Sequence, residues 1–436
     1  MPKLKIGLTF VCAAAIAAAA ETHSLTLQQA LSIAMRQNPE VVLTRLDVQR
    51  AQDDIRIAQN PFRPKLYGGS GLAYTYGYPN SIDGNAPSLF QAKTDMAIFD
   101  RPASYKVSAA RELAHGAQFG AAAKAEEVAY QTADLFLSAS QTEHESETLG
   151  KEIPSLNKVL ETMNAAVREG SELPLEQKRA QVNLAVSQQR LEAATLDADY
   201  YEMMLATVLG FPATDRVKPM DAEMPVMTTP ASESEASDIA LRNNRELQQM
   251  QSNVLAKQLD LRSYKAERLP KIDAVAQYSL FAKQNYENYF QKFQHNNAQL
   301  GASITIPLLI GPQAKALADQ AAIDMSKLRL QMMQVRNRII SDTRRSYQQW
   351  QKATTIRDLT RMQLDLAREN LTVLLAQNGE GRVPLRDVEQ ARLEENDRWI
   401  ALFDAETQLT RTKIAILRQM GTLVAALRGG SAPDTP

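Results

Sequence analysis

The sequence predicts an α+β membrane protein built from a duplicated helix–strand–strand–helix–helix unit. Four short segments alternate apolar and polar residues, the pattern of a strand whose two faces meet different surroundings. Two segments of nearly continuous helical character are longer than a single globular domain needs. Motifs of the first half also recur in the second half at a nearly constant shift, which indicates a duplication.

The chain begins with the features of a secretory signal peptide. Lys3 and Lys5 precede an apolar run that ends in alanines, so residues 1–20 are predicted to be removed by cleavage after Ala20. The only cysteine, Cys12, lies inside this segment, and the mature chain therefore has no disulfide. A lipid anchor at Cys12 is the alternative, although the residues before it are a poor context for lipidation.

Composition excludes several classes of function. The 436 residues carry a formal net charge of −1, so no basic excess is present to neutralise nucleic acid phosphates. No glycine-rich phosphate loop or Ser/His/Asp pattern is visible, and the histidines lack metal-ligand spacing: His23, His115, His144 and His295. We therefore expect no enzyme activity, no cofactor and no metal site. No later segment has the roughly 18 apolar residues of a membrane helix, so any membrane contact must come from strands.

The first structural repeat is predicted to span residues 21–212. An amphipathic helix over 25–37 opens it and ends where Pro39 follows. Strands are expected near 65–78 and 89–99. A long helical hairpin over 103–209 then completes the repeat, with a turn rich in glycine and proline at its tip.

The second structural repeat is predicted to span residues 233–428, after a linker at 213–232 that is rich in proline, methionine and threonine. Its strands are expected near 271–283 and 298–308, and its helical hairpin over 313–427. Three pairs of segments show the duplication: 33–40 with 239–246, 64–66 with 270–272, and Gly210 with Gly421. The last residues, 429–436, are expected to be a disordered tail.

The alternating segments predict how the strands are used. In 298–308 the apolar row is Ala298, Leu300, Ala302, Ile304, Ile306 and Leu308. Strands of about 9 to 11 residues with apolar and polar faces fit an outer-membrane barrel, although a half-buried soluble sheet is the alternative. Because a barrel needs roughly eight strands to close, four strands per chain require several copies. Three copies predict a shared 12-stranded trimeric β-barrel, continued by a long α-helical coiled-coil tunnel.

In the order and doubling of these features, the mature chain resembles the TolC-like outer-membrane efflux protein family. The resemblance rests on Ile-Ala-x-x-x-Asn before Asn38 and Asn244, Pro-Lys pairs at Pro64 and Pro270, Ile-Pro-Leu at 306–308, and glycine-containing hairpin tips. It implies a homotrimeric channel in the outer membrane of a Gram-negative-type bacterium, with a tunnel extending into the periplasm. It also implies partners: outer-membrane lipid, a periplasmic adaptor (membrane fusion) protein and an inner-membrane transporter of a tripartite efflux or secretion system.

The resemblance points to an acidic ring at the periplasmic entrance. The family opens its last helix with Asp-Val-Leu-Asp-Ala, whose aspartates line that entrance, and the matching stretch here is 387–391. Asp387 matches the first aspartate, whereas Gln390 takes the place of the second, which predicts a thinner ring. Three copies of Asp387 would favour cations. The alternative is a carboxylate that the helix macrodipole favours near a helix start.

The tips of the two helical hairpins are the expected adaptor-docking sites. The docking residues suggested by the resemblance are Gly170, Leu173, Pro174, Gly381, Val383 and Pro384. Ordinary turn chemistry is the alternative, since glycine permits unusual backbone angles and proline starts helices. The nearby carboxylates are expected to be solvated surface: Glu169, Glu172, Glu176 and Glu380. A periplasmic coiled-coil scaffold or adaptor without a pore is the alternative function.

Overall fold

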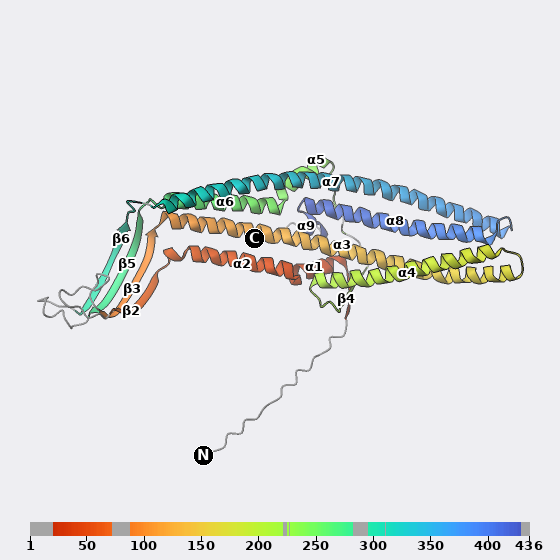
Figure 1. Cartoon of the computed structure of the whole chain (residues 1–436), viewed down its shortest axis with the longest axis horizontal. Helices are drawn as coiled ribbons and strands as arrows, with labels where there is room; N and C mark the ends of the chain where they lie inside the picture. The colour runs from red at the N-terminus through yellow and green to blue at the C-terminus, as the bar shows by residue number, and fades with distance from the viewer. Residues whose placement is uncertain are drawn as a thin grey trace, which may run out of the picture.

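The computed structural model describes residues 21–71, 88–220, 225, 227–281, 295–309 and 311–428. The molecule is a long rod with a β-sheet at one end and the tips of two helical hairpins at the other (Figure 1). Some predicted features lie outside the described residues: the signal peptide with Cys12, the end of the first strand at 72–78, the end of the third at 282–283, and the tail at 429–436.

The second half of the chain repeats the element order of the first half. The first half contains α1 Leu27–Gln37, α2 Pro39–Ala58, a short 3₁₀ turn Asn60–Phe62, β2 Lys65–Gly71, β3 Ser88–Phe99, α3 Arg101–Arg168 and α4 Pro174–Leu209. The second half contains α5 Glu233–Asn243, α6 Arg245–Ala266, β5 Lys271–Phe281, β6 Asn296–Thr305, α7 Pro312–Gly379, α8 Leu385–Gln419 and α9 Leu423–Leu427. Helices α3 and α7 each contain 68 residues, which corresponds to about 100 Å at the α-helical rise.

The duplicated asparagines act as helix caps. Asn38 Oδ1 accepts hydrogen bonds from the backbone N–H groups of Glu40 and Val41, at 2.9 and 3.2 Å, and Asn38 Nδ2 donates to the Val208 carbonyl at 2.7 Å. Asn244 Oδ1 accepts from the Leu247 N–H at 3.0 Å. In both repeats the side chain satisfies backbone donors that the start of a helix leaves unpaired.

The glycine pair closes each repeat in the same way. Gly210 and Gly421 have φ angles of 86° and 65°. A Cβ added to Gly210 would lie 2.8 Å from the Gln37 carbonyl oxygen, and one added to Gly421 would lie 2.9 Å from that of Asn243. Only glycine fits both the backbone angle and this close approach. Because Gly421 interrupts the last helix, α8 ends at Gln419, whereas the sequence predicted helix to 427.

The four-stranded sheet is antiparallel throughout, with strand order β2-β3-β5-β6. The register places Leu66 opposite Thr94, Phe90 opposite Leu280, and Ile272 opposite Ile304. Residues that face each other in a ladder project from the same face, so the apolar rows of the strands share one face and their polar rows share the other.

Among the described residues, no element covers the apolar face of the sheet. Leu66, Leu300 and Ile304 are 78 %, 89 % and 64 % exposed. Strand β6 ends at Thr305, short of the predicted 308, and Pro307 lacks the N–H that would extend the ladder. Among the strands that the structure describes, β2 and β6 form the two edges of the sheet, and each has a neighbour on only one side.

A second, small sheet was not foreseen. Strand β1, Thr22–Leu25, pairs in parallel with β4, Arg216–Pro219, which lies inside the predicted linker. The first helix therefore begins at Leu27, two residues later than predicted, and Thr26 caps it in a reciprocal capping box with Gln29.

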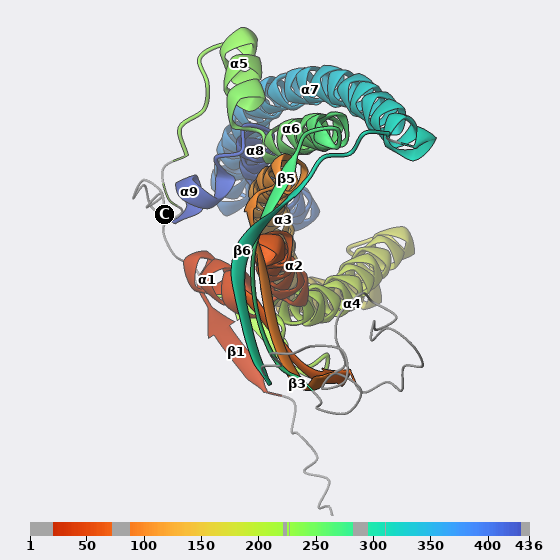
Figure 2. The same cartoon turned by 90° about the vertical axis from the view of Figure 1, so that its left-hand side faces the viewer.

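The apolar core lies midway along the rod, where the short helices pack on the long ones. Buried residues from five helices meet there: Leu31, Phe136, Leu205, Leu209, Leu417 and Leu423. The side view places α1 and α9 near the middle of the rod (Figure 1), and the end view shows both at one side of the long helices (Figure 2). Among the residues that the structure describes, no helix combines the length and the apolarity needed to cross a membrane.

Candidate functional site

The two hairpin tips have the same turn geometry. Gly170 and Gly381 have φ angles of 75° and 72° and have open space around them. The next residues complete the turns, because the N–H of Ser171 donates to the Ala166 carbonyl and the N–H of Arg382 donates to that of Gln377, both at 2.9 Å. This hydrogen bond spans six residues and is characteristic of a Schellman motif, in which a glycine ends the helix. Turn chemistry therefore accounts for both glycines, and it also leaves their backbones exposed at the end of the rod.

The predicted docking residues differ in exposure between the tips. Leu173 is 64 % exposed, and Val383 is half-buried. The other four are exposed: Gly170, Pro174, Gly381 and Pro384. Pro174 occupies the first turn of α4, and Pro384 is the N-cap of α8. The first tip thus presents the more apolar surface.

The predicted entrance residue Asp387 lies in the first turn of α8, with its side chain 41 % exposed. Its carboxylate accepts a hydrogen bond from Nε of Arg386 at 3.1 Å. That hydrogen bond, together with the attraction of Asp387, Glu176 and Glu172, raises the pKa of the Arg386 guanidinium. Sequence reasoning missed this neighbouring cation, although the adjacent Arg-Asp pair was visible.

A cavity of about 420 Å³ lies between the two hairpins close to their tips. Asp387 and Gln390 line it from α8, and Glu176 and Arg179 line it from α4. Glu176 was expected to be solvated, but it is only 9 % exposed, and Arg179 pairs with it at 2.9 Å. Asp387 and Gln390, which stand at the two aspartate positions of the family motif, therefore face the first hairpin of the same chain.

Polar contacts connect the two hairpins further from the tips. Arg190 of α4 pairs with Asp397 of α8 at 2.8 Å, and this hydrogen bond raises the pKa of the Arg190 guanidinium. Glu152 of α3 accepts from the hydroxyl of Ser187 at 3.0 Å and from the side-chain amide of Asn396 at 3.4 Å. Helix α3 thus holds α4 and α8 in a fixed relation.

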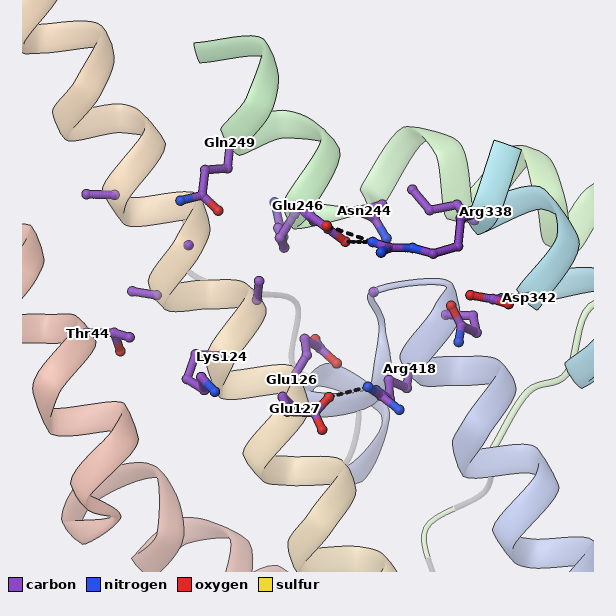
Figure 3. Close-up of a pocket in the computed structure, with 18 of the residues that line it drawn as sticks. Thr44, Lys124, Glu126, Glu127, Asn244, Glu246, Gln249, Arg338, Asp342 and Arg418 are labelled. Carbon is purple, nitrogen blue, oxygen red and sulfur yellow. Dashed lines mark hydrogen bonds and ion pairs between the residues drawn. The ribbon is translucent and has the colours of Figure 1, made fainter. Parts of the chain in front are cut away.

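A larger cavity of about 750 Å³ lies in the middle of the rod, between helices α2, α3, α6, α7 and α8 (Figure 3). Its lining carries charges of both signs, and two pairs of these side chains bond to each other. Arg338 makes two hydrogen bonds of 2.7 Å to the Glu246 carboxylate, and Arg418 pairs with Glu127. Because side chains of both charges line the cavity, its electrostatic potential is not of one sign and would not select an ionic ligand.

Glu126 lies in the wall of this cavity and caps α9. Its carboxylate oxygens lie 3.3 and 3.4 Å from the donating N–H of Val424. Burial raises the pKa of Glu126 to about 7, against the lowering effects of the backbone hydrogen bonds from Val424 and Leu423. The carboxylate joins α3 of the first repeat to the end of the second repeat.

Two of the scattered histidines pack on aromatic rings. The His144 ring stacks on Phe403 with centroids 4.1 Å apart, between α3 and α8. His23 stacks on Phe211 with centroids 4.4 Å apart. In the described part of the chain, no group of three or more His, Cys, Asp or Glu side chains is placed to hold a metal ion.

A family model matches the second half of the chain. Residues 236–422 match the family model for outer membrane efflux protein. No curated protein matches the chain in sequence.

Solved structures share the fold over almost the whole chain. The outer-membrane channel OprN superposes with a TM-score of 0.71 at 14 % identity, covering 91 % of this chain and 89 % of that one. The Vibrio cholerae outer membrane protein VceC gives 0.70 at 15 % identity, covering 93 % and 96 %. The open state of the Neisseria gonorrhoeae MtrE outer membrane channel gives 0.69 at 15 % identity, covering 93 % and 91 %.

The fold of this chain is the one seen in solved outer-membrane channels. Together with the match of residues 236–422 to the outer membrane efflux protein family, this fold confirms the predicted resemblance to TolC-like proteins. The family is one of transport proteins, and neither comparison supports a periplasmic scaffold without a pore.

Proposed function

We propose that this protein is the outer-membrane channel of a tripartite efflux or secretion system. It would pass substrates from an inner-membrane transporter and a periplasmic adaptor to the exterior without doing chemistry on them. The observation that carries the proposal is the open four-stranded sheet, which has one apolar face and one polar face at the end of a rod about 100 Å long.

The edges of this sheet support a barrel that is shared between chains. An unpaired strand edge leaves backbone N–H and C=O groups without partners, which lipid cannot supply. Strands β2 and β6 both have such edges. Three chains would join β6 of one copy to β2 of the next and give twelve strands, above the roughly eight needed for closure.

The long helices support the same assembly. Apolar side chains follow one stripe of α4 and one stripe of α7, and they are half exposed or more in the single chain. On α4 these are Val182, Val186, Leu196 and Tyr200, and on α7 they are Leu330, Met333, Leu359, Met362, Leu366 and Val373. The two helices lie at opposite sides of the helical layer (Figures 1 and 2). Packing α4 of one copy on α7 of the next buries both stripes and, repeated, closes a ring.

At the far end of the tunnel, three copies of Asp387 would form the periplasmic entrance, with Arg386 reducing their net charge. The exposed tips would dock the adaptor through Gly170, Leu173 and Pro174 of the first hairpin. The equivalent residues of the second hairpin would do the same: Gly381, Val383 and Pro384.

A pair of lysine substitutions tests the barrel. Leu300 and Gln299 are neighbours on β6 that project from opposite faces of the sheet. In a barrel, Leu300→Lys places a charge against lipid at a cost of about 2–4 kcal/mol per copy, whereas Gln299→Lys faces the aqueous lumen. We expect wild type and Gln299→Lys to yield surfactant-resistant trimers that dissociate on heating in a gel, and Leu300→Lys to lose them. Equal behaviour of the two variants, or a wild-type monomer that remains soluble after membrane removal, contradicts the proposal.

A further inference from the structure

The predicted cleavage site lies next to a buried carboxylate. Glu21 would be the first residue after the cut, and its backbone nitrogen donates to Oδ1 of Asp215 at 3.3 Å. Asp215 is only 6 % exposed. The contact joins positions 194 residues apart, so it connects the start of the mature chain to the segment between the two repeats.

The surroundings of Asp215 hold this carboxylate in place. His23 Nε2 lies 3.4 Å from Oδ2 of Asp215, and the His23 ring stacks on Phe211. The Thr214 hydroxyl donates to Oδ1 of Asp215 at 3.3 Å. Burial raises the pKa of Asp215, but the hydrogen bonds from Glu21, His23 and Thr214 together lower it below its ordinary value. The carboxylate is therefore ionised at neutral pH.

The small parallel sheet fixes the position of Glu21. The Arg216 N–H donates to the Glu21 carbonyl at 3.0 Å, and the next four residues pair in register with β4. Val217, at the centre of β4, is fully buried. The nitrogen of Glu21 is thus held at Asp215 by backbone pairing on one side and by the core on the other.

Asp215 lacks a permanent cation within the described chain. His23 is the one ionisable donor at its carboxylate, and it is charged only when protonated. The adjacent Arg216 guanidinium pairs with Asp199 instead, through contacts of 2.6 and 3.1 Å. The carboxylate thus has hydrogen-bond partners but no permanent positive charge beside it. A positive group at the position of the Glu21 nitrogen would turn the existing contact into a stronger, charge-assisted hydrogen bond.

We propose that Asp215 is the binding site for the mature N-terminus, and that signal-peptide removal supplies its cation. Hydrolysis of the Ala20–Glu21 bond by a signal peptidase consumes one water. The Ala20 carbonyl becomes a carboxylate that leaves with residues 1–20, and the Glu21 nitrogen becomes an amine that takes a proton. In the precursor this nitrogen is a neutral amide with one N–H, whereas in the mature protein it is an ammonium group paired with Asp215. Processing therefore strengthens the attachment of β1 to β4.

Acylation of the terminal amine tests this pairing. The full chain is expressed and exported, and N-terminal sequencing of the purified protein is expected to begin at Glu21. An amine-reactive reagent is then applied at pH 7, and its attachment to the tryptic peptide 21–36, which contains no lysine, is followed by mass spectrometry. An ordinary α-amine has a pKa of about 7.7–8.0, so a rise of half to one unit slows acylation about three- to tenfold.

We expect slow acylation in wild type and in Asp199→Asn, a matched control for the exposed neighbouring pair, and rapid acylation in Asp215→Asn. A synthetic peptide of residues 21–30 provides the unpaired reference rate, and it keeps the test valid where Asp215→Asn does not fold. The slow rate should approach the reference near pH 10, once the ammonium has lost its proton. A mature N-terminus at another residue, equal rates at pH 7, or a difference that persists at pH 10 would each overturn the proposal.

Discussion

The two repeats share one contact, in which the glycine after the last long helix of each repeat packs on the end of the first helix of that repeat. They differ in the element that follows this glycine. Gly210 packs on the end of α1 and Gly421 packs on the end of α5, with nearly the same clearance. After Gly210 the chain forms β4, which pairs with β1. After Gly421 it forms α9, which Glu126 caps. The crowded turn is thus a constraint of the duplicated unit itself, whereas the elements attached to it were free to diverge.

Substitution of the two crowded glycines should break what the repeats share. We expect Gly210→Ala and Gly421→Ala each to lower the free energy of unfolding by about 3 kcal/mol. The left-handed backbone costs an alanine about 1–2 kcal/mol, and the overlap with a carbonyl oxygen adds a repacking cost of about 1–3 kcal/mol. Denaturant unfolding followed by circular dichroism measures both.

The tip glycines are the matched control for this experiment. Gly170 and Gly381 have similar φ angles but open space around them. Gly170→Ala and Gly381→Ala should therefore show only the backbone cost, about 1–2 kcal/mol. If the crowded and the open glycines give the same loss, close approach to the first helix is not the shared constraint.

The pH dependence of stability should separate the repeats, because only the second ends, in the described part of the chain, in a helix capped by a partly buried carboxyl. The pKa of Glu126 is about 7 in the folded protein, against 4.5 unfolded. The folded state therefore binds the proton of Glu126 more tightly than the unfolded state does. The stabilisation of the fold by this proton is complete below pH 4.5 and is lost as the pH rises to 7. The loss is about 3 kcal/mol.

The isosteric variant Glu126→Gln removes this titration and keeps an oxygen for the Val424 N–H. We expect it to match wild type near pH 4.5 and to be more stable above pH 7, as measured by unfolding midpoints across that range. Parallel pH profiles for the two proteins would show that Glu126 is not the titrating group.

The asparagine caps should give the smallest difference between the repeats. Asn38 makes three hydrogen bonds through its side chain and is 5 % exposed, whereas Asn244 makes one bond to the start of α6. We expect Asn38→Ala to cost about 2 kcal/mol and Asn244→Ala about 1 kcal/mol in the same unfolding measurement. A larger loss for Asn244→Ala than for Asn38→Ala would mean that the number of hydrogen bonds at the cap does not determine its contribution to stability.

Features with a sequence period were predictable. Alternation over 298–308 placed Leu300 and Ile304 on one face, and the observed register puts them opposite Ala276 and Ile272. The strand period of two is strict, so a correct alternation fixes the face. The pairing of Gly210 with Gly421 was likewise visible as a repeat.

Features that depend on distant parts of the chain were not predictable. Strands β1 and β4 have four residues each, which is too short for an alternating pattern to be recognised in the sequence. Almost the whole first repeat separates them along the chain. The burial of Glu176 was missed because the other hairpin covers it. The Arg386–Asp387 pair is adjacent in sequence, but sequence alone does not show that the two side chains bond to each other.

Conductance across a planar bilayer tests the central claim, a trimeric channel with Asp387 in its entrance. Purified wild type, Asp387→Ala and the control Glu380→Ala, which removes another exposed tip carboxylate, are compared with and without a millimolar trivalent cation. The account predicts a small cation-selective current that the trivalent cation blocks in wild type and Glu380→Ala, and blocks less in Asp387→Ala. Equal block in all three proteins would contradict the entrance ring, and a protein that is monomeric and carries no current would contradict the channel.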